Sequence, residues 1–496
     1  MKIEICISPA HSHLLRVNRF DYDVAILGGG SAGFASARTA AGAGLKTIVV
    51  EGGAEVGGLC ILRGCMPTKA LLYAAEVMHL ARHPEPWGIR PGKAGFDFTR
   101  VMARKNALIS GFAECRRKQL TAGKFKFIRA NAGFLDEHTV KLTPLHPVSS
   151  HPLPVGRGEG RGEGHFLTAK TFIVATGSTV APSPLPQLDQ IGYLTSDDAL
   201  ALKRLPKSLL VLGGGPTACE FAQFFARFGV EVTLVQRGEH LLKEFDADAA
   251  VELEKVFRRE GIRVFTGTRL VDARRKGRAK TVTFEHEGKL VSASVEEILF
   301  ALGRVPNTAA LGLENAGVRT EKGRILANAW MQTTAPHIYT AGDCTGPHEM
   351  VHLAVRQGEI AGHNVAHPDA RRRMDYRLLI AVVFTEPQLA LVGLTEKAAT
   401  LRGVPFRSAS YPFGEHGKSL IMEARDGFVK LLAEPKSGGI LGGACVGPAG
   451  SELVHEIVAA MAKRMTVREL AAMPHYHPTL AEIWTYPAEE LAGQIR

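Results

Sequence analysis

The chain has 496 residues, of which 45% are hydrophobic and 22% charged, and this length predicts three or four domains of a globular protein. Its formal net charge of +11 could indicate nucleic acid, an anionic membrane surface or anionic small molecules as partners. The basic residues are spread along the chain, however, and the short basic runs at 274–276 and 371–373 contain no aromatic residues, which argues against nucleic acid.

Seven cysteines, an odd number spread over a long chain, are not typical of a secreted disulfide framework and favour a reducing, cytoplasmic location. Residues 1–19 lack the long apolar run of a signal peptide, and we interpret them as an N-terminal tail or the product of a start codon placed too early. No run of about 18 apolar residues is present that could cross a membrane. We therefore expect neither a membrane nor nucleic acid among the partners.

The first predicted unit is a strand–turn–helix–strand segment near the N-terminus. A short apolar run at 23–27 predicts a buried parallel strand, and an alanine-rich stretch at 34–43 predicts a helix. A second strand is expected over 44–50, and it ends in Glu51. Between the first strand and the helix, residues 28–33 read GGGSAG and match the G-x-G-x-x-G of dinucleotide-binding units.

Each position of this motif has a physical role in binding a dinucleotide. Gly28 would form the tight turn, Gly30 would let the backbone approach the pyrophosphate, and Gly33 would let helix and strand pack closely. The free N–H groups at the start of the helix would bind phosphate, and Glu51 would accept hydrogen bonds from a ribose. We therefore expect a first dinucleotide cofactor to contact Gly28, Gly30, Ser31, Ala32, Gly33 and Glu51.

A pair of cysteines follows this unit. Cys60 and Cys65 lie in the stretch GGLCILRGCMPTK at 57–69, and on a helix this spacing would place both near one face. A disulfide between them would require Cα atoms about 4.4–6.8 Å apart. Pro67 suits the first turn of a following helix, on which the charge of Lys69 would stabilise a thiolate or a reduced flavin. A redox dithiol beside a nucleotide cofactor is the favoured interpretation, and two structural cysteines are the alternative.

These residues resemble the signature of the pyridine nucleotide–disulfide oxidoreductase family, which includes dihydrolipoamide, glutathione and mercuric reductases. Every fixed position of G-G-x-C-x-x-x-G-C-x-P-x-K is present, and the resemblance runs from about Asp21 to the C-terminus. By this likeness Cys60 is the interchange thiol that attacks substrate and Cys65 is the charge-transfer thiol against the flavin. Gly58 and Lys69 would then lie beside FAD.

The resemblance implies an α/β fold with two Rossmann-like domains, for FAD and NAD(P), and a C-terminal α+β dimerisation domain. We expect an N-terminal tail at 1–19 and a first part of the FAD domain at 20–178. The NAD(P)H domain would follow at 179–300, the second part of the FAD domain at 301–369, and the dimer interface domain at 370–496.

A second dinucleotide unit is predicted in the middle of the chain. A strand is expected over 208–212 and a helix over 219–228, and between them residues 213–218 read GGGPTA. A further strand is expected over 230–235. NAD(P) would contact the small residues of this turn and a glycine of the strand that leaves the domain: Gly213, Gly215, Ala218 and Gly303.

The end of that second strand indicates which nicotinamide is used. Gln236 stands where an acid would bind a free ribose 2′-OH, and Arg237 and Lys243 follow it. Cations attract a 2′-phosphate, so the sequence favours NADPH, while the alternative is that either cofactor is accepted. By the resemblance, Glu220 pairs with Lys69.

Two further stretches are expected to return the chain to the flavin. Residues 174–177 resemble the strand that leaves the first domain and would bring Thr176 and Gly177 to FAD. Residues 339–343 resemble the second flavin signature, in which Gly342 and Asp343 hold the ribityl chain or the pyrophosphate. His352 would lie beside the flavin edge, where a structural role is as plausible as a functional one. The low-complexity segment 143–165 is interpreted as an extended, mobile hairpin loop.

The C-terminal part changes to antiparallel strands, expected at 382–388 and 427–431, and a helix at 451–461. Near the end, His477 and Glu482 form a His-Pro-Thr-x-x-Glu element, and an imidazole with a carboxylate is a general acid–base pair for neutral pH. By the likeness, His477 protonates the leaving thiolate, Glu482 orients it, and both come from the other subunit of a homodimer. His475 is interpreted as structural or substrate-edge.

The leading hypothesis is an FAD-dependent enzyme that moves electrons from NADPH, or from NADH, through FAD and the Cys60–Cys65 disulfide to a small disulfide. Arg38 stands where glutathione reductases bind a substrate carboxylate, although an exposed helix arginine is the commoner explanation. The same groups could also transfer electrons in the reverse direction, from a dithiol substrate to NAD. The sequence is also compatible with a mercuric reductase-like enzyme, a flavin-dependent quinone or oxygen reductase, and a non-catalytic flavoprotein scaffold. No metal site is expected.

Overall fold

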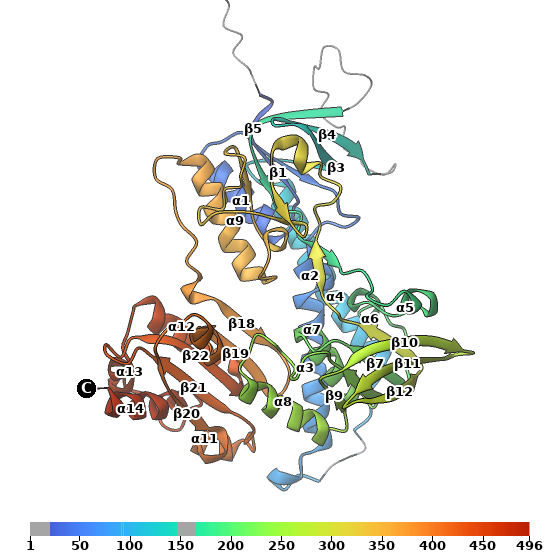
Figure 1. The fold of residues 1–496 in the computed structure, drawn as a ribbon, viewed down its shortest axis with the longest axis vertical. Coiled ribbons are helices and arrows are strands. Elements are labelled where there is room, and N and C mark those ends of the chain that lie inside the picture. The colour runs from blue at the N-terminus through green and yellow to red at the C-terminus, as the bar shows by residue number, and fades with distance from the viewer. Residues whose placement is uncertain (1–19, 91, 93, 146–164, 496) are drawn as a thin grey trace, which may run out of the picture.

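The computed structural model describes residues 20–90, 92, 94–145 and 165–495 (Figure 1). The expectations for the tail at 1–19 and for most of the segment 143–165 therefore lie outside the described residues. Within that part of the chain, no helix is both long and apolar enough to cross a membrane.

The first layer is a mainly parallel sheet at the top of Figure 1. Five of its strands are parallel, and β4 joins the ends of two of them by antiparallel pairing. The strands are β1 (Tyr22–Leu27), β2 (Thr47–Glu51), β3 (Lys126–Asp136), β4 (Thr139–Pro144), β5 (His165–Val174) and β17 (Ile338–Thr340). On one face, α1 (Ser31–Gly42) and α9 (Val351–Ala366) pack together over buried residues such as Ile26 and Ile360.

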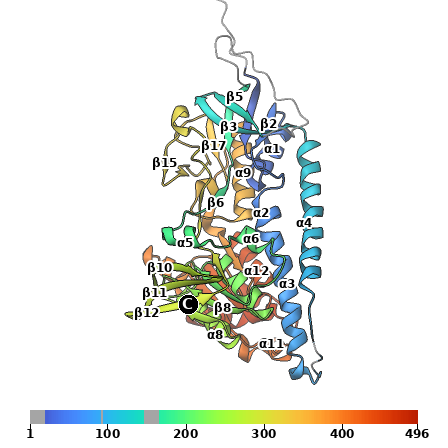
Figure 2. The ribbon, with the colours of Figure 1, turned by 90° about the vertical axis from the view of Figure 1, so that its right-hand side faces the viewer.

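The cysteine segment forms two helices rather than one. The short α2 (Leu59–Arg63) carries Cys60, and α3 (Cys65–Arg82) begins at the second cysteine. The prediction of a single helical face was wrong, because Gly64 between them adopts φ −131° and ψ −115°, which is not helical. Helix α4 (Phe98–Thr121) then runs beside α3 along the length of the molecule (Figure 2). It begins at Asp97, whose side chain accepts a hydrogen bond from the backbone of Arg100.

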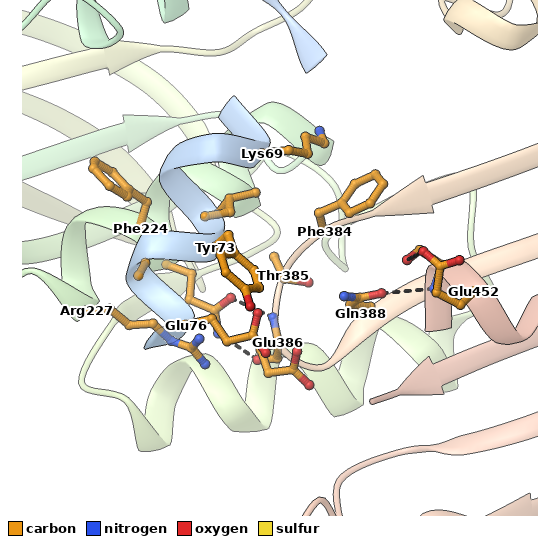
Figure 3. A pocket seen from close by; sticks show the side chains of 14 residues that line it. Lys69, Tyr73, Glu76, Phe224, Arg227, Phe384, Thr385, Glu386, Gln388 and Glu452 are labelled. Carbon is orange, nitrogen blue, oxygen red and sulfur yellow. Dashed lines mark hydrogen bonds between the residues drawn. The ribbon is translucent and has the colours of Figure 1, made fainter. Parts of the chain in front are cut away.

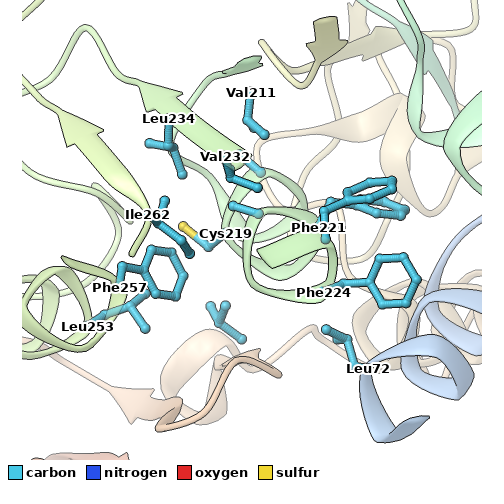
Figure 4. Packing of buried hydrophobic residues seen from close by; sticks show 14 of the residues in the cluster. Leu72, Val211, Cys219, Phe221, Phe224, Val232, Leu234, Leu253, Phe257 and Ile262 are labelled. Atoms are coloured by element: carbon cyan, nitrogen blue, oxygen red, sulfur yellow. The ribbon is translucent and has the colours of Figure 1, made fainter. Parts of the chain in front are cut away.

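A second parallel sheet has the order β13-β7-β8-β9. Its strands are β7 (Ser208–Leu212), β8 (Glu231–Val235), β9 (Arg263–Phe265) and β13 (Glu297–Phe300). One face carries α7 (Pro216–Arg227) and α8 (Ala247–Arg259), which close a core of aromatic and aliphatic side chains (Figure 4). The other face carries the antiparallel strands β10 (Arg269–Lys276), β11 (Ala279–His286) and β12 (Lys289–Val295). The short helices α5 (Pro186–Ile191) and α6 (Ser196–Ala199) precede this unit.

A two-stranded link connects the two nucleotide units. After β5 the chain leaves the first sheet through β6 (Ser178–Val180), and it returns through β14 (Arg304–Pro306), which pairs antiparallel with β6. The next strand of the first sheet, β17, adds beside β5. The first unit is therefore built from two separate parts of the sequence.

The third layer is an antiparallel sheet of order β18-β19-β22-β21-β20. Its strands are β18 (Ile380–Val383), β19 (Gln388–Gly393), β20 (Arg407–Pro412), β21 (Phe428–Ala433) and β22 (Ile440–Gly447). The single strand expected at 382–388 is instead two strand ends separated by the turn at 384–387. Helices α12 (Gly450–Ala462), α13 (Val467–Ala472) and α14 (Thr485–Gln494) complete the core with Trp484, and α10 (Glu396–Leu401) and α11 (Gly417–Ile421) lie in the connections.

Candidate active site

The first nucleotide motif forms a cradle at the carboxyl end of β1. Gly30 caps the start of α1, and a Cβ added at Gly33 would collide with the carbonyl oxygen of Gly28. The carboxylate of Glu51 accepts hydrogen bonds from the backbone N–H of Gly29 at 2.8 Å and of Gly53 at 2.6 Å. This is the strand–turn–helix arrangement that binds a pyrophosphate and a ribose.

The other predicted flavin residues gather around the same cradle. Ala32 of α1 is buried against the strand ends after β5 and β17, and Gly342 donates its N–H to the buried Gln357 at 2.8 Å. Asp343 accepts a hydrogen bond from Ser178 at 2.7 Å. The hydroxyl of Thr176 is buried without a hydrogen-bond partner among the described residues, and it adjoins Gly177.

Close backbone approach completes this cradle. A Cβ on Gly58 would lie 2.8 Å from the Cα of Gly30, so the segment before Cys60 rests directly on the nucleotide loop. The glycine cradle, the carboxylate of Glu51 and the unpartnered hydroxyl of Thr176 together fit a bound dinucleotide.

The two cysteines are in contact and chemically unequal. They are free thiols joined by a hydrogen bond, and that bond raises the pKa of Cys60, as burial also does. The same hydrogen bond, aided by the charge of Lys69, lowers the pKa of Cys65 to about 7. In the reduced pair, the thiolate therefore resides on Cys65 and the proton on Cys60.

Lys69 is held in place by side chains from the second nucleotide unit and from the C-terminal unit. Its ammonium lies 2.8 Å from the carboxylate of Glu220 on α7 and 4.6 Å from the ring centroid of Phe384, in the turn after β18. Glu220 is almost fully buried and also accepts the backbone N–H of Phe384 at 3.0 Å. The cation beside Cys65 is thus fixed by packing rather than left to move in solvent.

The protonation of Cys65 gives a direct test of this arrangement. Because its pKa is lowered to about 7, the thiolate should be present above that pH and be lost as the pH falls through it. Lys69→Met should raise the midpoint by about one pH unit by removing the favourable charge, and Lys69→Arg should leave it unchanged. The pH dependence of thiolate ultraviolet absorbance in the dithiothreitol-reduced protein measures this midpoint. Equal midpoints in the Met and Arg variants would contradict the role of the charge.

A cavity of about 230 Å³ adjoins Lys69, between α3, α7 and the turn before β19 (Figure 3). Tyr73 and Glu76 enter it from α3, and Glu386 enters it from the turn. Burial and then the neighbouring charge of Glu76 raise the pKa of Glu386 to about 8, so this carboxyl is protonated at neutral pH. The cavity thus presents a hydrogen-bond donor rather than a second negative charge beside Glu76.

The second nucleotide motif repeats the geometry of the first. Gly213, directly after β7, has φ +115°, and a Cβ there would collide with the carbonyl oxygen of Ala301. Gly215 caps α7, which begins at Pro216, earlier than the sequence indicated, since proline suits the first helical position. The strand 208–212 is confirmed as β7, and Ala218 is buried behind the turn.

The residues expected to select the nicotinamide lie beside this loop. The backbone N–H of Arg237 donates to the side-chain oxygen of Gln236 at 3.1 Å. The guanidinium of Arg237 is exposed and has no ion-pair partner among the described residues. Lys243 is exposed, with Glu244 as its ion-pair partner at 3.6 Å, and the adjacent Leu242 donates its N–H to Gly214. Gly303 has φ +117° and accepts the N–H of Ala181, on the link between the units.

The predicted acid–base pair is formed within one chain. The Nδ1 of His477 lies 2.9 Å from Oε2 of Glu482, and the imidazole is 77% exposed while the carboxylate is 11% exposed. Burial opposes ionisation of Glu482, but the hydrogen bond from His477 holds its pKa below the usual value. The charged carboxylate fixes the ring and directs Nε2 to the surface, where it can exchange a proton with a bound molecule.

Comparisons with known proteins agree with this geometry. The family model described as pyridine nucleotide-disulphide oxidoreductase matches residues 22–358, and the model of its dimerisation domain matches residues 379–488. The chain belongs to the pyridine nucleotide–disulfide oxidoreductase family. The expected family, fold class and type of enzyme are thereby confirmed, and FAD and NAD(P) are the cofactors typical of this family.

Individual relatives indicate the class of enzyme but do not identify the substrate. The chain is 34% identical to a dihydrolipoyl dehydrogenase of Bacillus subtilis over 93% of its own length and 96% of the relative. It is 31% identical to a mercuric reductase of Staphylococcus aureus, over 93% and 81% of the two chains. The crystal structure of LpdA from Mycobacterium tuberculosis superimposes with a TM-score of 0.82 at 30% identity, covering 94% of this chain and 99% of the other. The chain is therefore a flavoprotein disulfide reductase of the dihydrolipoyl dehydrogenase and mercuric reductase class.

Three basic side chains near the site have partners in the fold. Arg63, between the cysteines, points to Asp197 at 3.5 Å, so its charge is met by a carboxylate outside the cysteine segment. Arg38 pairs with Glu359 at 3.1 Å. The imidazole of His475 bonds Glu456 at 2.7 Å and has a mostly buried side chain, which fits a structural role.

One histidine of the site carries no sequence motif. His416 is fully buried, with Nδ1 2.8 Å from the hydroxyl of Ser419 and Nε2 3.5 Å from the second oxygen of Glu482. Burial lowers the pKa of His416, so the ring is neutral beside the carboxylate. Glu482 is therefore held between two imidazoles, one exposed and one buried. Only the fold could reveal this, since the α11 segment is far from the His-Pro-Thr element in sequence.

Proposed function

We propose that this chain is a homodimeric, FAD-dependent reductase that carries electrons from NADPH to a small disulfide through Cys60 and Cys65. The observation that carries the proposal is the unequal, hydrogen-bonded dithiol beside the Lys69–Glu220 pair. Such a dithiol holds two electrons and can pass them on by thiol–disulfide exchange.

FAD would rest on the first cradle, held by Gly30, Ser31, Glu51, Thr176 and Asp343. When bound, it supplies hydride acceptance from the nicotinamide and passes the two electrons to the cysteine pair. NADPH would rest on the second cradle, formed by Gly213, Gly215, Ala218, Arg237, Lys243 and Gly303. Lys69, paired with Glu220, would provide a positive charge beside the reduced flavin ring.

The cysteines then divide the substrate chemistry. His477 accepts the proton of the Cys60 thiol as the Cys60 sulfur attacks one sulfur of the substrate. This forms a mixed disulfide and releases a thiolate, to which His477 returns the proton. The Cys65 thiolate next attacks the Cys60 sulfur, which re-forms the internal disulfide and releases the second substrate sulfur as a thiolate that takes a proton from solvent. One nicotinamide hydride and one proton thus balance the two thiols produced.

The proton donor would come from the second subunit of the homodimer. The family's dimerisation domain carries His477, and this imidazole is largely exposed in the single chain. Within the proposed dimer, the partner subunit's His477 would close the substrate site over Cys60, with Glu482 holding the ring.

The choice of NADPH rests on Arg237. Its unpaired, exposed guanidinium would bind the 2′-phosphate, and a charge-assisted hydrogen bond of this kind is worth about 1.5–3 kcal/mol. Arg237→Ala should therefore raise the KM for NADPH roughly tenfold or more and leave the KM for NADH unchanged. Steady-state kinetics with both nicotinamides measures this, and Arg278→Ala, an exposed arginine of the same unit, is the matched control. A wild-type preference for NADH would overturn the assignment.

The reverse direction is the second candidate, and the dihydrolipoyl dehydrogenase relatives favour it. The same dithiol would then accept electrons from a dithiol substrate and pass them to NAD. A screen of oxidised glutathione, lipoamide and dihydrolipoamide against both nicotinamides separates the two. Turnover of dihydrolipoamide with NAD, without disulfide reduction by NADPH, would replace the first proposal by the second.

His416 is proposed as a positioning residue for the acid–base pair. Its neutral ring beside Glu482 restricts the carboxylate, so His416→Ala should lower kcat about tenfold and shift the acidic limb of its pH profile, with KM little changed. His416→Gln should restore part of the rate, because its amide nitrogen can take the place of the Nε2 atom that faces Glu482. A pH profile identical to that of the wild type would contradict the positioning role.

A further inference from the structure

Arg116 is a cation without an anion near the reactive cysteine. It lies on α4, with its guanidinium stacked 4.4 Å from the ring centroid of Phe34 on α1. Its Nε and Nη1 atoms are buried and have no hydrogen-bond partner among the described residues, and within the same part of the chain the side chain forms no ion pair. A guanidinium withdrawn from water in this way is costly unless an anion meets it.

The neighbouring helices place this charge near the dithiol. Helix α4 packs against α2, which carries Cys60. Burial lowers the pKa of Arg116, and the charge of a Cys60 thiolate is the largest influence that raises it, followed by that of the neighbouring Cys115. Cys60 keeps its proton in the reduced pair, so among the described residues no group supplies the negative charge that this guanidinium lacks.

A second arginine marks the same region but is already neutralised. Arg38 lies one helical turn beyond Phe34 on α1, close enough to act electrostatically on Arg116. Its guanidinium is paired with Glu359, whereas Arg116 has no such carboxylate in the described part of the chain. Of the two arginines, only Arg116 is therefore free to bind an anion from outside the chain.

We propose that Arg116 binds an anionic group of the substrate, and that the substrate is a disulfide with a carboxylate close to its sulfurs. This inference rests on the proposed function for the disulfide but not for the anion site. The planar guanidinium, held on the Phe34 ring, would donate a hydrogen bond to the carboxylate through Nη2, which is not among its buried atoms, as that group brings the sulfur towards Cys60.

The test compares two alkylating agents of similar size, the anion iodoacetate and the neutral iodoacetamide. The holoenzyme is reduced with dithiothreitol, freed of it anaerobically, and the alkylation rate at Cys60 is followed by peptide mass spectrometry. Arg116→Met fills the same space without the charge, and it should lower the iodoacetate-to-iodoacetamide rate ratio about fivefold. Arg116→Lys should keep most of the ratio. The neighbouring Arg117, exposed and paired with Glu114, gives the matched control Arg117→Met, which should change nothing.

Two outcomes would overturn the proposal. One is an unchanged rate ratio in Arg116→Met, and the other is loss of bound flavin in that variant, which would assign Arg116 to the cofactor. Since alkylation needs no turnover, it tests for the anion site even if the enzyme reduces no disulfide.

A second experiment measures turnover of 3,3′-dithiodipropionate and of its diamide. Arg116→Met should lower kcat/KM about tenfold for the diacid and less than about twofold for the diamide. Failure of the wild type to reduce either compound would reject the disulfide activity alone.

Discussion

Replacing Cys60 by serine is expected to reduce disulfide turnover by a factor of about a thousand or more, because no other group can form the mixed disulfide. The reaction of the nicotinamide with the flavin should keep its rate, since Cys60 takes part only after electrons have left the cofactor. Stopped-flow absorbance measures the flavin step, and a coupled thiol assay measures turnover. The two observations together separate the roles of cofactor and dithiol.

Cys115→Ser is the matched control, because Cys115 is a free, exposed cysteine on α4. It should leave both rates unchanged. If Cys60→Ser kept most of its turnover with the natural acceptor, electrons would leave directly from the flavin, and the enzyme would be a quinone or oxygen reductase.

Replacing His477 by glutamine should lower disulfide turnover by about 10²–10⁴ while leaving flavin reduction intact. Glutamine can still bond Glu482, but it cannot deliver a proton to the leaving thiolate. The loss should be greatest for substrates whose thiols have a high pKa, because these leaving groups depend most on protonation. Unchanged turnover would remove His477 from the mechanism.

Mixing the two inactive proteins tests whether the site is shared between subunits. In a dimer of one Cys60→Ser chain and one His477→Gln chain, one of the two sites keeps both residues if the histidine comes from the partner. After random subunit exchange, activity should recover to about a quarter of the wild-type value. No recovery would show that Cys60 and His477 act within one chain.

Local motifs predicted the nucleotide cradles because each depends on neighbouring residues. The strand at 208–212 and the glycines at positions 28, 30 and 33 follow from hydrophobic runs and from backbone approaches that only glycine permits. Helix ends were placed less well. The non-helical Gly64 divides the cysteine segment, because the fold requires the chain to turn there.

Contacts between distant segments could not be predicted in the same way. Phe384 meets Lys69, and His416 meets Glu482, only because separate layers pack together. Arg116 is an ordinary residue of an amphipathic helix in the sequence, and its isolation becomes visible only when the helices are placed in space. The pairing of Lys69 with Glu220 was available beforehand only through the family resemblance.

The central claim is that Cys65 holds a thiolate against FAD when the enzyme carries two electrons. Anaerobic titration of the holoenzyme with NADPH measures it most directly. After one equivalent, a long-wavelength absorbance band from the thiolate beside oxidised flavin should appear, and it should be absent in Cys65→Ser. A wild-type protein that passes straight to fully bleached flavin without this band would contradict the account.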